Sequence, residues 1–413
     1  MTVTAVLQRA GTLPGWARSA LIAAGLVLIL SITVTLTGQT QLASSGTSEA
    51  AVRLGLPILF AALGGLWAER AGIINIGLEG MMVLGTWGAA WVGYQWGPWA
   101  AVLGGLAFGA LGGLVHAIAT VTFNVNHIVS GVAITLLGTG LTKYLATLLF
   151  TPVSQNPRQS PRLEGFEQFS VPGLSPGLQA LEAQQRVFVS DLAGLLSGLV
   201  TGLTPIVVLG FVLVPVSYWI LWRTAFGLRL RSSGESPVAA ESLGVNVIAH
   251  KYVAVVVSGG LAGLGGAALV LNPGQLGYLE NQVGGRGYIG LAAMIFGNWR
   301  PAGLLVGSAL FGYVDGLQLR AGGEAVHALL YGATLVAVVV AVLWAIRRMW
   351  TAAAVALGAG AAVYALYWTF DTVPSEFASY APQLVTLIVL AAASQRLRPP
   401  ARLGDEYRRG EGG

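Results

Sequence analysis

Long apolar runs constrain the fold of this chain more than any other feature of its sequence. Runs of about 20 residues recur from Ala20 to Ala393, and a helix needs about 20 residues to cross ~30 Å of hydrocarbon. Charged residues make up only 9% of the chain, against about 25% in soluble domains, so they could not cover a water-facing surface. The sequence therefore predicts an all-α fold, a polytopic transmembrane helical bundle.

Twelve apolar segments are candidate spans, which predicts about 10–12 crossings. One of them, 287–298, is too short to cross alone, so we expect a broken or re-entrant helix there. The first could instead be a signal peptide, because Arg9 and Arg18 precede it, but its apolar core is long for that and we expect it to be retained. The twelve segments are 20–38, 52–69, 73–93, 98–122, 127–150, 203–222, 252–272, 287–298, 302–319, 325–345, 351–369 and 378–395.

Lysine and arginine set the orientation expected for these spans. If the N-terminus lies inside and the chain alternates, most basic residues fall on the cytoplasmic side, which is the usual bias. Both termini are then cytoplasmic. The same topology accounts for the net charge of +5 and the pI near 9.6 without a nucleic-acid partner, so membrane lipid is the expected surrounding.

Polar interruptions divide the chain into sections. Residues 151–202 are an expected exterior insert rich in Pro, Ser, Gln and Gly, either a solvated loop or a docking surface, and 181–194 within it is predicted to be a surface helix. The other sections are an N-terminal segment with the first span and an exterior loop (1–50), the first half of the membrane core (51–150), a span (203–222), a cytoplasmic loop (223–251), the second half of the core (252–345), C-terminal spans (346–395) and a cytoplasmic tail (396–413).

Small residues recur every four positions in two of the spans. Such spacing puts them on one helix face, where they let two helix backbones approach closely. The pattern predicts tight helix contacts without saying which helices meet. The two sets are Gly105, Gly109 and Gly113, and Gly259, Gly263 and Ala267.

The polar stretch Arg223–Lys251 separates two long apolar runs and contains the signals of a short helix. Ser236 suits the N-cap, and Pro237 suits the first helical position because its missing N–H would be unpaired there anyway. Gly244 tolerates the left-handed conformation that ends many helices. We expect a basic loop holding a helix over 237–243, which is too short to be stable without a surface to pack on.

This stretch resembles the coupling loop of ABC importer permeases in the branched-chain amino acid, ribose and nucleoside group. Segments 69–82 and 284–301 are also similar to blocks of the nucleoside and simple-sugar branch. The resemblance implies the type II ABC importer permease fold in a prokaryotic cytoplasmic (inner) membrane. It also implies that residues of the stretch couple the permease to an ATPase: Arg231, Gly234, Glu235, Pro237, Ala239, Ala240 and Gly244.

The resemblance further implies a division of labour among subunits. The short helix would bind in a groove of a separate ABC ATPase subunit, and the chain has no phosphate-binding loop of its own, so ATP is used by that partner and no cofactor is bound here. The other implied partners are a second permease subunit, forming a heterodimer, and an extracellular or periplasmic solute-binding lipoprotein. With no cysteine and four scattered histidines, we expect no metal site and no catalytic residue.

Polar side chains inside or beside the spans are candidates for the solute path, because buried polar groups in membranes usually face protein or water. Asn75 and Glu79 lie four apart, which would place them on one helix face; the competing interpretation is a structural pair that holds helices together. The full set of path candidates is Asn75, Glu79, Asn126, Asn272, Gln275 and Gln282.

The function that these observations favour is import of a small neutral polar solute by alternating access, with a nucleoside as the first choice. A simple sugar such as ribose or galactose and a branched-chain amino acid are the alternatives within the family. An ion-coupled secondary transporter would need a buried ionisable couple on matched broken helices, and no matched pair of repeats is visible. An integral-membrane enzyme is not expected, because paired catalytic carboxylates and nucleophile motifs are absent.

Overall fold

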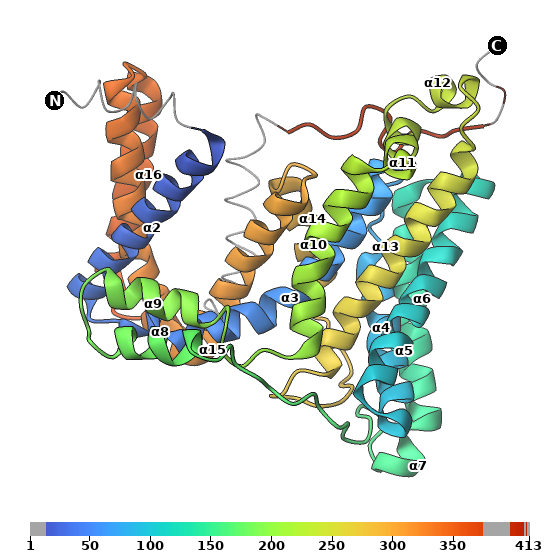
Figure 1. Ribbon diagram of the computed structural model, residues 1–413, viewed down its shortest axis with the longest axis horizontal. Coiled ribbons are helices and arrows are strands. Elements are labelled where there is room, and N and C mark those ends of the chain that lie inside the picture. Colours follow the sequence, from blue (N-terminus) through green and yellow to red (C-terminus); the bar gives the residue numbers. More distant parts are fainter. Residues whose placement is uncertain (1–13, 375–396, 409, 411–413) are drawn as a thin grey trace. The chain divides into compact units, whose positions relative to one another are not determined.

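The structure is a computed structural model that describes residues 14–374, 397–408 and 410. Every regular element among these residues is helical (Figure 1). By internal contacts the chain divides into two compact units, which we describe one at a time. The first comprises residues 1–51, 170–202 and 313–382, and the second comprises residues 52–169, 203–312 and 383–413.

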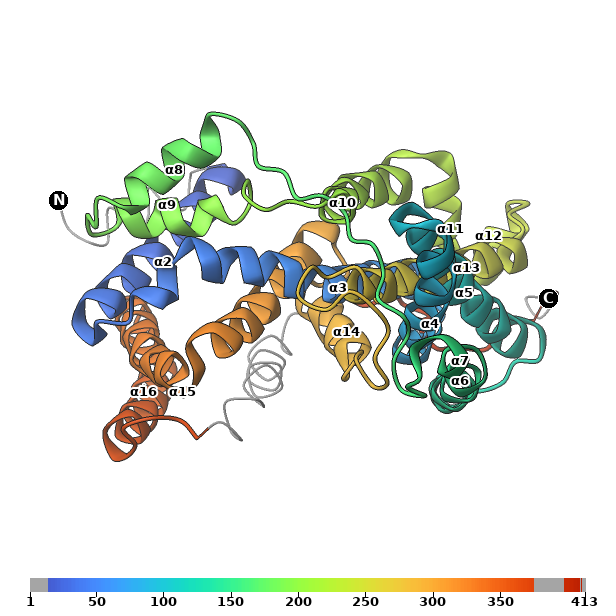
Figure 2. The same cartoon turned by 90° about the horizontal axis from the view of Figure 1, so that it is seen from below.

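The second unit is a helical bundle in which α4, α5, α6 and α13 pack together (Figure 1, Figure 2). α3 enters this unit at Val52 and α15 leaves it after Gly312. A π-helical turn, η2 (Ile118–Thr122), extends α5. The helices are α3 (Ser45–Arg70), α4 (Leu78–Trp96), α5 (Pro98–Ala117), α6 (His127–Leu149), α7 (Thr151–Ser154), α10 (Pro205–Arg223), α11 (Ala225–Glu235), α12 (Pro237–Ser242), α13 (Val247–Val270), α14 (Arg286–Phe296) and α15 (Pro301–Ile346).

The first unit combines the chain's earliest described helix with residues 170–202 of the insert and the last described helix. Its helices are α2 (Gly15–Thr37), the 3-10 turn η1 (Thr40–Ala43), α8 (Leu174–Glu182), α9 (Val189–Ser197), the later part of α15 and α16 (Trp350–Thr369). α15 bends at Gly322, whose φ of 63° lies in the left-handed region, so α15 consists of two helices. His327 and Tyr367 stack with ring centroids 4.4 Å apart and join α15 to α16.

The two stripes of small residues pack against each other within the second unit. A Cβ placed on Gly109 of α5 would lie 2.3 Å from the carbonyl oxygen of Gly259 on α13, and one on Gly263 would lie 2.1 Å from that of Gly105. No side chain fits at such distances, so the backbones of α5 and α13 are in direct contact. This confirms the predicted close packing and identifies the partner helices.

The prediction of a transmembrane helical bundle is confirmed. Among the described residues, eight helices are long and apolar enough to cross a membrane. The expected number was higher because it also counted α4, the short α14 and both halves of α15, together with 378–395, which lies outside the described residues. The segment 287–298 corresponds to α14, which has only 11 residues, as expected for a broken helix.

The prediction of one surface helix over 181–194 is wrong. α8 ends at Glu182 and α9 begins at Val189, and between them Gln185 and Phe188 have positive φ values. Asp191 accepts a hydrogen bond from the backbone N–H of Phe188 at 3.3 Å, which caps the start of α9. Short polar side chains such as that of Asp191 favour helix caps over helix interiors. The cap at Asp191 therefore starts a new helix within the segment that was predicted to be one continuous helix.

Candidate functional site

The polar stretch between α10 and α13 is two helices rather than the loop with one helix that the sequence predicted. α11 runs over Ala225–Glu235, and the hydroxyl oxygen of Thr224 accepts a hydrogen bond from the N–H of Gly227 at 3.1 Å at its start. Sequence reasoning missed α11 because its polar, basic composition resembles a loop. Thr224 as an N-cap was the signal that could have found it.

α12 follows at once and confirms the predicted short helix, over Pro237–Ser242. Ser236 stands at its N-cap position, but its side chain makes no capping hydrogen bond, so the expected capping by Ser236 is wrong. Gly244 has the expected left-handed φ of 81°. The N–H of Val245 donates to the carbonyl of Ala240 at 3.0 Å, which closes the last turn in the manner of glycine-terminated helices.

α12 has one buried face and one exposed face. Pro237 and Ala240 are buried against the rest of the second unit, whereas Ala239 is exposed. Val238 is 41% exposed, and Leu243, just after the helix, is 84% exposed. An apolar pair presented this way on a short helix is a surface suited to a protein partner. We call Val238, Ala239, Ser242 and Leu243 the outer face of α12.

The residues before α12 fix its base to the turn after α3. A Cβ on Gly234 would lie 2.4 Å from the carbonyl oxygen of Arg70, so only glycine allows this approach. The carboxylate of Glu235 lies 3.9 Å from the guanidinium of Arg70. Arg231 donates from Nε to the carbonyl of Leu221 at 2.8 Å. The expected coupling residues are thus brought together at one end of the bundle, where α11 and α12 lie in Figure 1.

α14 begins at a carboxyl group inside the bundle. Both oxygens of Glu79 on α4 accept backbone hydrogen bonds, from the N–H of Gly285 at 2.8 Å and from that of Gly287 at 2.7 Å. A carboxylate at a helix N-terminus satisfies orphan donors and complements the helix dipole. At its other end Trp299 donates from Nε1 to Glu69 at 2.6 Å. This broken helix is therefore held by a glutamate at each end.

The expected placement of Asn75 and Glu79 on one helix face is wrong. α4 begins only at Leu78, so Asn75 lies in the turn before the helix. Its side chain is fully buried and donates from Nδ2 to the hydroxyl of Ser258 on α13 at 2.9 Å, while its Oδ1 has no donor among the described residues. The two residues hold different helices.

The other path candidates do not converge on one site. Asn126 caps α6, accepting at Oδ1 from Ile128 and Val129 at 2.9 and 3.2 Å. Asn272 and Gln275 lie in the loop that follows α13, where the backbone of Gln275 donates to that of Asn272 at 2.8 Å. Asn126 and this loop are at opposite ends of the bundle, since the loop contacts the far end of α6.

That loop, residues 271–285, is fastened to the segment after α7. Glu280 pairs with Lys143 of α6 at 3.3 Å and with Arg158 at 3.4 Å. The backbone N–H of Ser160 donates to Tyr278 at 3.1 Å, and burial raises the pKa of Tyr278 above its usual value. These contacts join parts of the chain more than a hundred residues apart, and local sequence carried no signal for them.

A small polar pocket lies beneath the loop and contains Gln282. Its walls include the threonines of α4 and α6, Thr86, Thr139 and Thr142. The Oε1 of Gln282 accepts from the N–H of Leu279 at 2.9 Å, whereas its Nε2 is buried with no partner in the described part of the chain. The carboxylate of Glu280 also lines the pocket, so its polar groups are not all neutral. Of the lining residues, the sequence pointed only to Gln282.

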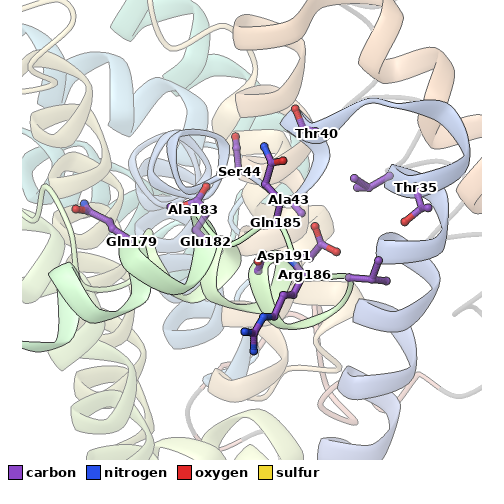
Figure 3. Close-up of a pocket in the computed structure, with 13 residues that line it drawn as sticks. Thr35, Thr40, Ala43, Ser44, Gln179, Glu182, Ala183, Gln185, Arg186 and Asp191 are labelled. Atoms are coloured by element: carbon purple, nitrogen blue, oxygen red, sulfur yellow. Dashed lines mark hydrogen bonds between the residues drawn. The ribbon is translucent and has the colours of Figure 1, made fainter.

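The first unit contains a larger pocket of about 670 Å³ between the end of α2, η1, α8 and α9 (Figure 3). Glu182, Arg186 and Asp191 supply its charged groups, and Thr35 and Thr40 supply hydroxyls. Glu182 is already engaged, because its Oε1 accepts from the N–H of Ser45 at 2.8 Å. None of these residues was singled out in the sequence.

Comparison with known proteins gives a consistent family assignment. The profile of the family described as "Branched-chain amino acid transport system / permease component" matches residues 47–339. The guanosine ABC transporter permease protein NupQ of Bacillus subtilis is 35% identical over 270 residues, covering 64% of this chain and 78% of the relative.

Two further relatives carry different names. The nucleoside ABC transporter permease protein NupC of Lactococcus lactis subsp. cremoris is 34% identical over 273 residues, covering 64% of this chain and 80% of the relative. The putative glucose ABC transporter permease protein TsgC13 of Haloferax volcanii is 36% identical over 282 residues, covering 67% and 78%. No solved structure matches the chain.

Proposed function

Because this chain belongs to the family of branched-chain amino acid transport system permease components, we propose that it forms the membrane pathway of an ABC importer for nucleosides. The similarity to the guanosine permease NupQ and the nucleoside permease NupC supports this substrate class. A glucose-type sugar is the second candidate, because TsgC13 is equally similar.

The substrate class is tested by competition. Cells that lack other nucleoside uptake systems, and that express this chain with its ATPase and solute-binding protein, are given labelled guanosine. We expect unlabelled nucleosides to suppress uptake and glucose to leave it unchanged. Suppression by glucose but not by nucleosides would instead assign the sugar.

The outer face of α12 is the proposed docking surface for the ATPase subunit. It presents Val238 and Leu243 to solvent on a helix whose other face is packed against the bundle. Motion of the ATPase would then push α12, and through it the helices on either side, in a rigid-body switch between inward-open and outward-open states. The single observation that best supports this surface is that Leu243, 84% exposed, and Val238, 41% exposed, stand together on it, an apolar surface that a partner protein could cover.

A pair of matched substitutions tests the docking surface. Leu243→Ser should release the ATPase from the purified complex and stop uptake, whereas Leu228→Ser on α11, where leucine is 58% exposed, should keep the ATPase bound. Retention of the ATPase by Leu243→Ser, or equal release by both variants, would contradict docking at this face.

The remaining partners are inferred from the same family assignment, and the orientation is inferred from the distribution of lysine and arginine. We infer a second permease subunit in a heterodimer, a solute-binding lipoprotein on the outer side, and a prokaryotic cytoplasmic membrane with both termini inside. The exposed leucines of α6, such as Leu136 and Leu137 at 71% and 66%, suit lipid or a second subunit. Because the chain has no cysteine, single cysteines at Leu243 and at Gln185 can be labelled in intact cells. We expect an impermeant maleimide to label only the second.

A further inference from the structure

The tail that follows the last apolar segment binds directly to the elements around α12. Figure 1 shows residues 397–408, at the red end of the colour bar, passing beside α11 and α12. These tail residues belong to the second unit together with α11, α12 and the ends of α3 and α14. Sequence analysis assigned no role to them beyond a cytoplasmic tail.

Tyr407 joins the tail to α12 itself. Its hydroxyl donates to Oε2 of Glu241 at 2.7 Å, and its ring, only 9% exposed, packs with Ala240 and Val247. The ammonium group of Lys251, on the first turns of α13, lies 5.8 Å from the centre of the same ring, within the range of a cation–π contact. Tyr407 therefore contacts the inner side of α12 and leaves the outer face free.

The tail also binds the base of α12. The N–H of Ala401 donates to Oε2 of Glu235 at 3.0 Å, and that of Arg402 donates to the carbonyl of Gly234 at 3.0 Å. Glu235 and Gly234 are the last residues of α11, immediately before α12. Both ends of the short helix are thus attached to one continuous tail segment.

The same segment reaches two helix ends deeper in the bundle. The N–H of Gly404 donates to the carbonyl of Gly72, in the turn after α3, at 3.0 Å. The N–H of Arg398 donates to Oδ1 of Asn298, just after α14, at 2.8 Å. These contacts connect α12, the end of α3 and the end of α14 to the same tail segment, residues 398–407.

We propose that residues 398–407 are a transmission strap that carries displacement of α12 to α3 and α14, with Tyr407 as its positioning residue. The covalent neighbours of α12 are α11 and α13, and α13 reaches α14 only through loop 271–285, which starts at the end of α13 farthest from α12. The strap supplies a second connection, by hydrogen bonds that span 166 positions in sequence to Glu235 and Glu241 and 100 positions to Asn298, just after α14. A helix as short as α12 has little stability of its own. Because the strap holds its inner side, a force on the outer face would move the attached helices instead of unfolding α12. This inference rests on docking of the ATPase at α12.

The test separates coupling from docking and from folding. The complex of permease, ATPase and solute-binding protein is reconstituted in proteoliposomes, and solute moved and ATP hydrolysed are measured together. In Tyr407→Ala we expect the ATPase to stay bound and active while the solute moved per ATP falls about tenfold, within the usual range of coupling between sites. Tyr407→Phe keeps the ring and loses only the hydrogen bond to Glu241, so its ratio should fall less.

Matched controls use Tyr144 of α6, which is 65% exposed. Tyr144→Ala and Tyr144→Phe should keep the wild-type ratio. If Tyr407→Ala leaves the solute moved per ATP unchanged, the proposed role of the strap is refuted. The same holds if uptake and ATP hydrolysis fall by the same factor, because the ratio is then unchanged. If Tyr407→Ala does not accumulate, Tyr407→Phe decides by the same ratio. Retention of the ATPase by Leu243→Ser would refute docking instead, whatever the Tyr407 variants do.

Discussion

Gly109 of α5 is a position at which one added methyl group would push two packed helices apart. Its Cβ would lie 2.3 Å from the carbonyl oxygen of Gly259 and 2.5 Å from the Cα of Gly263. Favourable contacts between carbon atoms begin at about 3.5 Å, so α5 and α13 would have to separate by about 1 Å. Overpacking of this kind costs about 1–3 kcal/mol. Alanine recovers up to about 1 kcal/mol through its better helix propensity.

With the full recovery, we therefore expect Gly109→Ala to lower the free energy of unfolding by up to about 2 kcal/mol. The control is Gly140→Ala on α6, where nothing lies within 4 Å of the added Cβ. That variant should gain a few tenths to about 1 kcal/mol from helix propensity alone. Both are measured by titrating the purified protein in mild detergent with a denaturing detergent. Equal stability of the two variants would refute backbone contact between α5 and α13.

Three other predictions concern the site. Glu79→Ala should lower stability by about 1–3 kcal/mol, because the buried N–H of Gly287 loses its acceptor, with a smaller loss from the half-buried N–H of Gly285. Glu79→Gln should lose less, and thermal unfolding of both variants compares them. Gly244→Pro should abolish uptake while membrane insertion stays normal, because proline fixes φ near −65° and the end of α12 requires a φ of 81° at this position. Uptake at the wild-type level would show that transport does not need the left-handed residue that ends α12. Glu280→Gln should change stability by less than about 1 kcal/mol, because exposed ion pairs contribute little and the side chains of its partners Lys143 and Arg158 are 63% and 75% exposed. A larger loss in the same unfolding assay would show that these ion pairs are shielded from water.

The parts of the fold that sequence predicted well are those with local causes. Apolar length located the spans, and Pro237 with Gly244 located α12 to within one residue, because both act through their own backbone conformation. The small residues of α5 and α13 predicted close packing for the same reason. The contact between these two helices was not predictable, because a four-residue repeat indicates a helix face of small residues but does not indicate which helix packs against it.

The parts that sequence missed depend on distant partners. α11 was taken for a loop because its polar residues were read without the helices it packs on. Asn75 was placed on α4 by spacing alone, whereas the chain is still turning at that point and its amide bonds Ser258 on α13. The contacts of Tyr407 and Glu280 follow from tertiary folding, and no pattern along the chain announces them. The set of path candidates therefore held residues that the fold places at separate points of the bundle.

The carboxyl group at the start of α14 has a consequence for anion binding. Bare helix starts are common cradles for phosphate, because their N–H groups point outward unpaired. Here the donors of Gly285 and Gly287 are already taken by Glu79. A phosphate group would meet occupied donors and an acidic side chain at this helix start, so it could not bind there as it does at a bare one.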